Sequence, residues 1–451
     1  MEERTITLEN TIISLLENKR FSSLKDIFVT MNPFDIAAVF EELPEEPLPL
    51  LFRLLPKELA AETFAEMGPD HQELLIKGFS DSELREVIGE LYTDDAAALV
   101  EEMPASVVKR ILNQADPEKR RMINEILNYP EDSAGSIMTT EYVDLRPGMT
   151  ASEAIDHIRR TGIDKETIDT CYVTDKSRIL IGTISIRTLI LANGGFAISE
   201  LMEPHVISVS TMEDQESVAN MFAKYNFTAL PVVDAENRLV GIVTVDDAMD
   251  VIVAEATEDI EKMAAITPSE RPYLKTPILE IWKSRILWLL LLMISATFTG
   301  MIITHFEDAL AAYVVLTAYI PMLMDTGGNS GSQSSVTVIR SLSLNDLEFS
   351  DIFRVVWIEA RVALLCGLTL GVVNFAKLLL FDQVGVTVAL VVCMTLVITV
   401  FAAKLVGCIL PLIAKKFGLD PAVCASPVLT TIVDALALLI YFSIATDLLG
   451  I

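Results

Sequence analysis

The chain has 451 residues, of which 51% are hydrophobic, and its formal net charge at neutral pH is −29. Residues 286–451 carry 11 acidic and 7 basic side chains, so −25 of this charge falls on the first 285 residues. A surface this acidic repels nucleic acid and anionic lipid headgroups and attracts cations, which excludes nucleic acid as a partner.

The cysteines and the N-terminus indicate where the chain resides. Four of the five cysteines lie in apolar stretches, and none has the paired spacing of a metal site. We therefore expect them to be packing residues in a reducing compartment. No apolar segment begins near Met1, so we expect no cleavable signal peptide and a cytoplasmic N-terminal part.

Residues 1–130 predict an acidic domain of short helices. A residue type that favours the cap or first turn of a helix recurs every 9–14 residues. Between these positions, segments such as DDAAALVEEM place apolar side chains on one face and carboxylates on the other. The repetition predicts a small α-solenoid. The expected helix starts are Pro33, Pro47, Pro56, Pro69, Ser80, Thr93, Pro104 and Pro117.

Residues 131–254 predict a tandem α/β repeat. Each copy reads as a short strand, a helix, a β-rich run, a turn, a further strand and a closing helix. The further strand reads IGTISI in the first copy and VGIVTV in the second. The copies resemble a pair of cystathionine β-synthase (CBS) domains, at 131–200 and 201–254. That resemblance implies a small ligand, often an adenine nucleotide such as ATP, and pairing into dimers.

One element of the CBS resemblance is present in a single copy. In CBS domains a Ser/Thr-x-x-Asp sequence after the last strand can hold a ribose. The second copy has this sequence from Thr244 to Asp247, whereas the first copy has Thr188 in place of the aspartate. Nucleotide binding therefore stays open, with Arg187, Phe227 and Asp247 as candidate contacts.

Residues 246–263 predict one continuous acidic helix that leads toward the apolar part of the chain, within a connecting segment at 255–275. Its carboxylates recur at three- and four-residue spacing, where like charges on a helix repel each other. The stretch offers Lys262 as its one basic residue, so we expect a divalent cation, Mg²⁺ or Ca²⁺, to neutralise them. These carboxylates are Asp247, Asp250, Glu255, Glu258 and Asp259.

Residues 276–451 predict an all-α domain embedded in a lipid bilayer. A run of about 20 apolar residues can cross a bilayer as a helix. Basic residues, among them Lys275, Arg340 and Lys416, flank one side of the expected spans, so the N-terminus is predicted to be cytoplasmic and the C-terminus outside. An odd number of spans leaves no obvious internal inverted repeat, which favours a pore across a homodimer. The five expected spans are about 286–304, 311–339, 355–380, 386–412 and 422–448.

The second expected span contains the polar sequence MDTGGNSGSQ at 324–333. Paired glycines at membrane depth can interrupt a helix and free backbone carbonyls, which is tolerated where they line water or bind ions. The alternative is close packing of helices through small residues. Both interpretations remain open from the sequence.

The last expected span contains one charged residue, Asp434, within residues 422–445. A charge at the bilayer centre costs about 2.5–3.5 kcal/mol on insertion scales, and such a cost is usually tolerated for function. Hydroxyl groups of Thr430 and Thr431 and an expected helix irregularity at Pro427 would add oxygen ligands for a hydrated cation. The alternative is an acid that is paired inside a helix bundle.

The chain resembles the MgtE magnesium channels over essentially its whole length. Four features carry this resemblance: the glycine-rich stretch at 324–333, SPVLTTIVDAL at 426–436, the CBS pair, and the helix that contains EATEDI at 255–260. The resemblance implies a homodimer with a helical N-terminal domain, a CBS pair, a connecting helix and five membrane helices. It makes Asp434 the pore acid, with Asn329, Gly328, Ser332 and Thr431 as further pore-lining residues.

The resemblance also implies cytosolic sites at which bound Mg²⁺ closes the pore. Asn226 and Ala98 stand where the family has aspartates, so some of these sites are expected to be weaker. The implied ligands are Glu62, Asp94, the Ser136 carbonyl, Glu216, the Ala223 carbonyl, Asp247, Asp250, Glu255, Glu258 and Asp259.

The expected function is a Mg²⁺-selective channel of the cell membrane, driven by the electrochemical gradient and closed by cytosolic Mg²⁺. One alternative is a coupled exchanger, with Glu359, Arg361, Lys377 and Lys404 as relay candidates, and another is a membrane-anchored CBS sensor that conducts no ions. The sequence has no phosphate-binding Gly-x-x-x-x-Gly-Lys-Ser/Thr loop and no metal-binding histidine pair, so we expect no enzyme. It does not rank Mg²⁺ against Mn²⁺, Co²⁺ or Ca²⁺.

Overall fold

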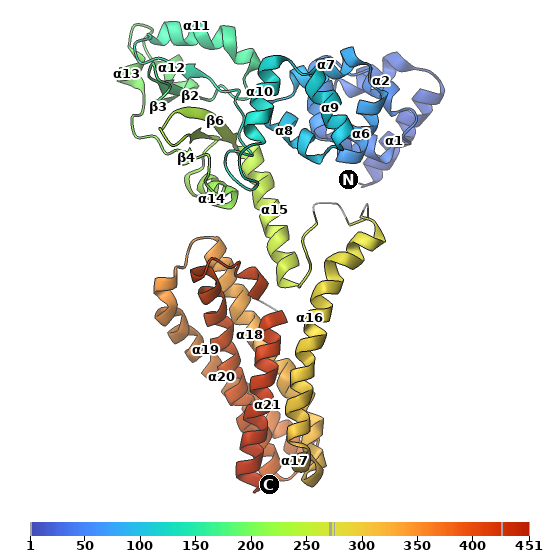
Figure 1. The fold of residues 1–451 in the computed structure, drawn as a ribbon, viewed down its shortest axis with the longest axis vertical. Helices are drawn as coiled ribbons and strands as arrows, with labels where there is room; N and C mark the ends of the chain where they lie inside the picture. The colour runs from blue at the N-terminus through green and yellow to red at the C-terminus, as the bar shows by residue number, and fades with distance from the viewer. Residues whose placement is uncertain (1, 270–272, 275, 425–426, 451) are drawn as a thin grey trace. The chain divides into compact units, whose positions relative to one another are not determined.

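The computed structural model describes residues 2–269, 273–274, 276–424 and 427–450, so Lys275 and Ser426 lie outside the described residues. The chain forms two compact units, residues 1–252 and 253–451. Each unit is described by itself below. Figure 1 shows both units and labels many of their helices and strands.

The first unit begins with a solenoid of short helices, as predicted. Prolines occupy the first turn of α3, α6 and α10, and Ser80 caps α7 in a capping box with Glu83. Helices two apart in the chain pack together, for example α3 with α5 and α5 with α7. The helices are α1 (Glu2–Glu17), α2 (Phe21–Phe28), α3 (Pro33–Glu42), α4 (Leu48–Phe52), α5 (Lys57–Ala65), α6 (Pro69–Gly78), α7 (Asp81–Glu90), α8 (Thr93–Glu102), α9 (Ala105–Gln114) and α10 (Pro117–Ile126).

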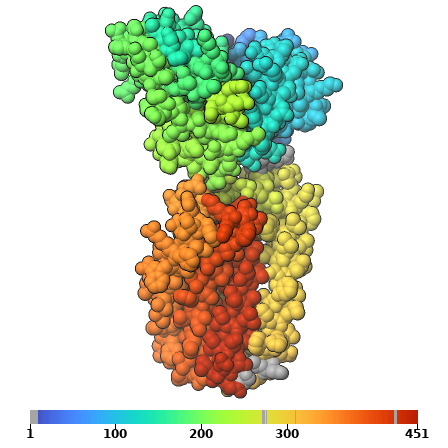
Figure 2. All heavy atoms as spheres, turned by 60° about the vertical axis from the view of Figure 1, so that its left-hand side comes forward, coloured from blue at the N-terminus to red at the C-terminus, as the bar shows by residue number. Residues whose placement is uncertain are grey.

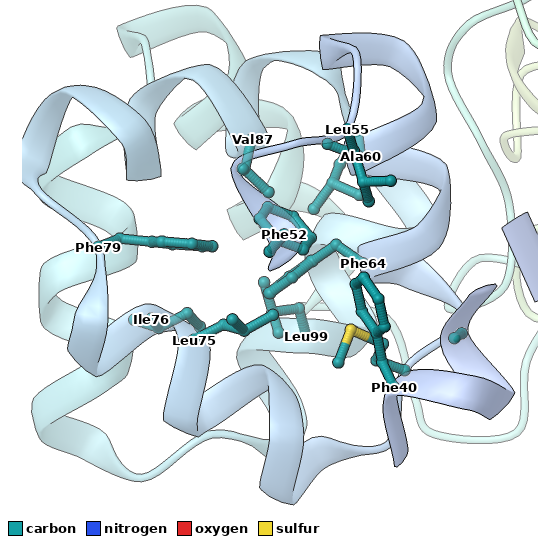
Figure 3. Packing of buried hydrophobic residues seen from close by; sticks show 14 of the residues in the cluster. Phe40, Phe52, Leu55, Ala60, Phe64, Leu75, Ile76, Phe79, Val87 and Leu99 are labelled. Atoms are coloured by element: carbon teal, nitrogen blue, oxygen red, sulfur yellow. The ribbon is translucent and has the colours of Figure 1, made fainter. Parts of the chain in front are cut away.

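The solenoid core consists of one apolar side-chain layer contributed by successive helices. Phe52 and Phe64 meet edge to face with ring centroids 6.1 Å apart, and Phe79 lies against both. Figure 3 shows these rings pointing into the interior between the helices. Aromatic side chains bury large apolar areas, so this layer stabilises helices that are individually too short to persist in water.

The tandem repeat folds as predicted, with two sheets of identical topology. In each copy the first strand pairs parallel with the second, which pairs antiparallel with the third. The first copy contains β1 (Asp144–Leu145), α11 (Ala151–Thr161), η1 (Gly162–Asp164), β2 (Thr170–Thr174), β3 (Leu180–Ser185), α12 (Ile186–Leu191) and α13 (Ile198–Leu201). The second contains β4 (Val209–Ser210), α14 (Gln215–Tyr225), β5 (Ala229–Val233), β6 (Leu239–Thr244) and the start of α15 (Val245–Met263).

The second unit is a bundle of long helices. α18, α19 and α21 all pack against α20, and α16 packs against α21. Figure 2 shows the orange and red atoms of this unit in one continuous surface. The elements are α16 (Ile278–His305), α17 (Glu307–Ala312), η2 (Val314–Tyr319), α18 (Ile320–Ser343), η3 (Phe349–Asp351), α19 (Ile352–Leu380), α20 (Val386–Lys416), η4 (Ala422–Cys424) and α21 (Pro427–Leu449).

Four helical segments among the described residues are long and apolar enough to cross a membrane: 278–305, 349–380, 386–416 and 427–449. They correspond to four of the five expected spans. The helical part of the predicted connecting segment 255–275 ends at Met263, because α15 stops there.

The second expected span begins later than predicted, and the structure decides between the two interpretations of its glycines. Residues 311–319 form the end of α17 and the η2 turn, and the helix α18 begins at Ile320. α18 runs without a break through Gly327 and Gly328, so these glycines do not free backbone carbonyls. A Cβ at Gly327 would lie 2.9 Å from side chains of both Thr399 and Val433, which means that the glycine permits close helix packing. The expected irregularity at Pro427 is also wrong, because Pro427 begins α21.

Candidate functional site

Three carboxylates from three parts of the first unit converge. Asp94 lies in the first turn of α8, Glu166 lies between η1 and β2 in the first copy of the repeat, and Asp247 lies in the first turn of α15. One oxygen from each lies within 4.8 Å of the others. Within the described ranges this is the one group of three such ligands close enough to hold a metal ion. The sequence indicated Asp94 and Asp247 and missed Glu166, which belongs to no recognisable motif.

Burial and mutual repulsion perturb all three acids of this carboxylate cluster. Burial raises the pKa of Asp94 well above its usual value, and the charges of Glu166 and Asp247 raise it further. Burial and the Asp247 charge raise the pKa of Glu166 to about 8. Burial raises the pKa of Asp247 to about 7, although a hydrogen bond from the Thr244 hydroxyl opposes the shift. The cluster therefore favours a proton or a cation over three bare negative charges.

Glu141 fixes the positions of the cluster. Its carboxylate accepts the hydroxyl of Thr93 at 2.6 Å and the ammonium of Lys119 at 3.2 Å, while its backbone carbonyl accepts the N–H of Glu166 at 3.0 Å. Burial acts to raise the pKa of Glu141, but Lys119 and the hydroxyl donors outweigh it and hold the pKa below its usual value. Glu141 thus stays ionised and joins the residue before Asp94 to the backbone of Glu166.

The donor set of the cluster suits a hard divalent cation. Carboxylate oxygens are preferred ligands of Mg²⁺ and Ca²⁺, and Mg²⁺ holds its ligands at about 2.0–2.1 Å, so that opposite ligands lie about 4.2 Å apart. Separations of up to 4.8 Å fit a Mg²⁺ ion that keeps water between itself and some carboxylates. Such an ion would connect the solenoid to both copies of the repeat.

The other predicted regulatory ligands are spread over both units. Glu62 is exposed on α5 and lines a separate cleft of about 670 Å³ with Lys119. Ser136 donates its hydroxyl to the Ser133 carbonyl at 2.8 Å. Asp250 lies on the exposed side of α15, but it is partly desolvated there. This desolvation and the charge of Asp246 raise its pKa. Glu216 and Ala223 lie on α14 in the first unit, whereas Glu255, Glu258 and Asp259 belong to the second.

The two positions that depart from the family pattern have different settings. Asn226 ends α14 with φ of 54°, a left-handed conformation that asparagine tolerates well. Ala98 is exposed on α8 and offers no side-chain oxygen. Asn226 can still contribute one side-chain oxygen to a metal ion, whereas Ala98 can contribute none.

In the second unit, Asp434 is half-buried on α21, where that helix packs against α18. Its charged neighbour is Asp325 on α18, a residue to which the sequence assigned no role. The hydroxyl of Thr431 donates to the Pro427 carbonyl at 3.0 Å, so its proton is engaged within the helix while its oxygen lone pairs remain able to accept. A Cβ at Gly328 would lie 3.5 Å from Thr430, which places this glycine at the contact between α18 and α21.

A cleft of about 510 Å³ lies between α18, α19 and α20. Asp325, the predicted pore residue Asn329 and Gln333 lie four residues apart along α18 and line it, together with Lys404 from α20. The predicted residues Gly328 and Ser332 are not among the described lining residues. Polar side chains at membrane depth face water or other protein rather than lipid.

The relay candidates of the exchanger alternative divide into two groups. Glu359 and Lys404 share the hydroxyl of Ser334, which donates to the Glu359 carboxylate at 2.6 Å and accepts from the Lys404 ammonium at 3.3 Å. By contrast, Lys377 pairs with Asp382 and Arg361 lies over the Trp357 ring. The distances are 2.9 Å for the Lys377 pair and 5.7 Å from the Arg361 guanidinium to the ring centroid.

A further cleft of about 760 Å³ lies between the two copies of the repeat. Phe227 lines it, as expected for a nucleotide contact, and so do Ser185 and Thr188 of the first copy. Arg187 and Asp247 are not among its described lining residues, and Asp247 belongs to the carboxylate cluster instead. The aspartate of the Ser/Thr-x-x-Asp element thus lies in the carboxylate cluster and not in the wall of this cleft.

Comparison with known proteins matches every part of this architecture. Family models match the MgtE divalent cation transporter domain at 320–444, the MgtE intracellular N domain at 31–132, and CBS domains at 134–195 and 198–254. The magnesium transporter MgtE of Thermus thermophilus is 39% identical over 459 residues, which cover 100% of this chain and 99% of that protein. The chain belongs to the MgtE family of magnesium transporters.

Two further relatives agree with this assignment. The MgtE magnesium transporter of Bacillus subtilis is 33% identical over 96% of each chain. The crystal structure of the cytosolic domain of the Mg²⁺ channel MgtE in complex with ATP is 39% identical, with a TM-score of 0.51, and covers 54% of this chain and 99% of that chain. MgtE proteins are transporters rather than enzymes, and this family argues against a sensor that moves no ions.

Proposed function

We propose that the chain forms a Mg²⁺-selective channel that admits Mg²⁺ down its electrochemical gradient and closes when cytosolic Mg²⁺ binds its acidic sites. The observation that carries this proposal is the carboxylate cluster of Asp94, Glu166 and Asp247. Each acid comes from a different part of the first unit, so one ion bound there holds three parts together. Without an ion, the same charges repel one another.

Closure follows from linkage between ion binding and conformation. An ion shifts an equilibrium only as far as it binds one state better than the other. The compact arrangement of the first unit gathers three oxygens within 4.8 Å, whereas a separated arrangement offers them singly. Mg²⁺ therefore favours the compact arrangement, and the continuous helix α15, which starts in the cluster, extends from it into the second unit.

The pore is assigned to Asp434 and the facing part of α18. Asp434 on α21 and Asp325 on α18 interact electrostatically, so two carboxylates from adjoining helices of the second unit lie near each other. Two carboxylates and nearby small polar residues suit a cation that enters with part of its hydration shell. A membrane potential of 100 mV supplies about 2.3 kcal/mol per elementary charge, hence about twice that for a divalent ion.

The functional assembly is proposed to be a homodimer in the cell membrane, with the N-terminal domains in the cytoplasm and the C-terminus outside. Basic residues near the cytoplasmic ends of the helices support this orientation, among them Arg340 at the end of α18 and Lys416 at the end of α20. The five membrane helices are proposed to be the four apolar helical segments together with α18, which at 24 residues is long enough to cross.

A nucleotide is proposed as an additional ligand of the cleft between the CBS copies. The relative whose cytosolic domain was crystallised holds ATP, and the cleft here has a volume of about 760 Å³ with Phe227 in its wall. Thr188 replaces the ribose-binding aspartate in this cleft, so the expected affinity is lower than in a CBS pair that has the acid.

A coupled exchanger remains the alternative, and one observation favours it. Glu359, Ser334 and Lys404 form a hydrogen-bonded chain in which Lys404 is 4% exposed. Ionisable groups buried at membrane depth often take part in proton movement. Transport that requires an opposing H⁺ or Na⁺ gradient would identify an exchanger, whereas Mg²⁺ flux driven by voltage alone identifies a channel.

The test of the pore assignment is Asp434→Asn in purified protein reconstituted into liposomes. We expect the variant to lose most voltage-driven Mg²⁺ uptake because the neutral amide no longer compensates the charge of a dehydrating ion. Asp447→Asn, a change of the same charge near the end of α21, serves as the control. Equal uptake by Asp434→Asn and wild type at equal protein density would contradict the assignment.

A further inference from the structure

One face of α19 is exposed at the edge of the second unit. α19 packs against α20 and forms one side of the helix bundle (Figure 1). On its exposed face, side chains recur at three- and four-residue spacing, so they lie above one another along the helix. This set is named here the α19 stripe, and it consists of the exposed residues Arg354, Trp357, Arg361, Leu364, Leu368 and Val372.

The first turns of the α19 stripe are basic and aromatic. The Arg361 guanidinium lies 5.7 Å from the centroid of the Trp357 ring, and its Nε donates to the Trp357 carbonyl at 3.2 Å. Within the part of the chain that the structure describes, Arg361 forms no ion pair with a carboxylate. A guanidinium carries five N–H donors in a planar fork that matches a phosphate group, so most of these donors remain able to bind an anion.

The acid nearest in sequence does not oppose an anion at this position. The Glu359 carboxylate accepts the hydroxyl of Ser334 on α18 at 2.6 Å. Residues two apart on a helix do not face the same side, so Glu359 points away from the α19 stripe. The stripe therefore carries the positive charges of Arg354 and Arg361 on its own.

Arg361 lies at one boundary of the apolar part of α19. Residues 362–376 carry no charge, and the next basic residue is Lys377. At 1.5 Å per residue, Arg361 and Lys377 are about 24 Å apart, against a hydrocarbon core of about 30 Å. Long basic side chains extend toward the lipid headgroups, and tryptophan concentrates at the same level. Arg361 and Trp357 thus lie at the depth of lipid phosphate groups.

An apolar groove of about 470 Å³ between α19 and α20 begins two turns farther along the stripe. All of its described lining residues are apolar, and all come from these two helices. Leu368 and Val372 form one wall, and Met394 belongs to the other; their exposed fractions are 51%, 71% and 46%. A Cβ at Gly371 would lie 2.9 Å from the side chain of Val397, so this glycine keeps the groove deep where the two helices meet.

A phospholipid complements both parts of the stripe. Its phosphate matches the guanidinium fork of Arg361, and an acyl chain that descends from the headgroup reaches the groove at Leu368. A second protein copy would have to present both an acid at the membrane boundary and an apolar ridge below it. The groove also contains no described residue of α18 or α21, the helices to which the pore between subunits is assigned.

We propose that the α19 stripe and the groove between α19 and α20 bind one anionic phospholipid, with the phosphate on Arg361 and an acyl chain in the groove. Each basic residue near the membrane surface favours a lipid of net negative charge, so phosphatidylglycerol is preferred over the zwitterionic phosphatidylcholine. The bound lipid stabilises the packing of α19 on α20. This site requires only that the second unit lies in a bilayer, and it does not rest on the proposed Mg²⁺ channel.

The headgroup contact is tested by native mass spectrometry of full-length protein released from liposomes that hold equal amounts of phosphatidylglycerol and phosphatidylcholine. Wild type is expected to retain phosphatidylglycerol in preference to phosphatidylcholine. Arg361→Gln should lower this preference roughly fivefold, the size expected for one basic residue near the membrane surface. Arg361→Lys should keep part of the preference because the positive charge remains. Lys377→Gln, the same loss of charge at the far end of α19, is the matched control.

Leu368→Trp tests the groove separately from the headgroup contact. The larger side chain fills part of the groove, so retention of both lipids should fall while the preference for phosphatidylglycerol persists. Val373→Trp is the control, because Val373 is 64% exposed on α19 and is not among the described lining residues of the groove. Equal loss of lipid in the two tryptophan variants would show that the groove is not the acyl-chain site.

The unfolding temperature in nanodiscs supplies a second readout. Adding phosphatidylglycerol to nanodiscs of phosphatidylcholine should raise the wild-type midpoint more than that of Arg361→Gln, because a ligand of the folded state stabilises it. Equal retention of both lipids by wild type, or an unchanged preference in Arg361→Gln, would overturn the proposal. Loss of a dimer in Leu368→Trp at an unchanged unfolding temperature would also overturn it, since the groove would then be a subunit contact. Neither readout depends on Mg²⁺ flux, so failure of the proposed function would be seen separately.

Discussion

Glu166→Gln removes one charge from the carboxylate cluster at nearly constant side-chain size. Burial, followed by repulsion from Asp247, raises the pKa of Glu166 from 4.5 to about 8, which corresponds to about 5 kcal/mol for keeping it ionised. Asp94 and Asp247 share this repulsion, so we expect the substitution to relieve about 2–3 kcal/mol. The gain should appear only in the absence of a divalent ion.

The sign of the pH dependence follows from the direction of the shift. The folded pKa of Glu166 lies above the unfolded value, so the folded state binds the proton more tightly and loses stability as pH rises from about 4.5 to about 8. Glu166→Gln should therefore match wild type near pH 4 and be more stable than wild type above about pH 8. The advantage should grow steadily between these limits.

The assay is thermal unfolding of a soluble fragment that ends after α15, comparable to the separately crystallised cytosolic domain of the relative. At high pH with chelator, the variant should unfold roughly 5–10 °C above wild type, from the usual scaling for domains of this size. Saturating Mg²⁺ should raise the wild-type midpoint strongly and that of the variant much less, because one ligand is lost. Glu200→Gln, an exposed carboxylate on α13, is the control of equal charge change.

Two results would refute this reasoning. If Glu166→Gln were less stable than wild type at high pH without metal, repulsion would not dominate the cluster. If the variant kept the full Mg²⁺-dependent shift of its unfolding midpoint, the cluster would not be the site at which Mg²⁺ binds.

The remaining predictions concern proton competition and helix packing. Protons compete with Mg²⁺ for Glu166 and Asp247, whose pKa values are raised to about 8 and about 7. Lowering the pH from about 8 to about 6 should therefore weaken Mg²⁺ binding to the fragment at least tenfold, as measured by calorimetry. A constant affinity would show that other groups bind the ion. Gly407→Ala would push a methyl group into the backbone of Gly331, so it should lower the unfolding temperature of the full-length protein. Gly385→Ala is the control, because Gly385 has open space around it and the change should leave that temperature unaltered. Equal unfolding temperatures of the two variants would contradict the close packing of α18 on α20.

The repetitive parts of the chain were predictable because their signals are local. Proline at the first turn and serine at the cap start helices for reasons that lie within four residues, and the predicted starts such as Pro69 and Ser80 are confirmed. The tandem repeat was predictable for a similar reason, since each strand pairs with others of its own copy in the same order.

The polar membrane helix was harder to predict because the same residues support two structures. Gly327 and Gly328 are compatible with a broken helix and with a tightly packed one. The decision depends on Thr399 and Val433, which are far away in the chain but lie against Gly327. A run of small residues indicates that another segment packs closely against it. It does not indicate which segment that is.

The ionic contacts were also beyond the sequence. Glu166 follows a short turn and carries no motif, and its role depends on Glu141, which holds its backbone N–H. Lys262 was the visible basic residue in an acidic helix, but its partner Asp420 lies more than 150 residues later. Electrostatic pairing across such separations is set by the fold, so composition alone could not identify this partner.

Cytosolic Mg²⁺ is proposed to close a channel whose pore acid is Asp434. Single-channel recording of the purified full-length protein in a planar bilayer tests this most directly, with Mg²⁺ varied on the side of the N-terminal domains. We expect unitary currents carried by Mg²⁺ whose open probability falls as Mg²⁺ on that side rises, while the current through an open channel follows voltage. Unitary currents whose open probability ignores Mg²⁺ on that side, or flux without unitary currents, would contradict it.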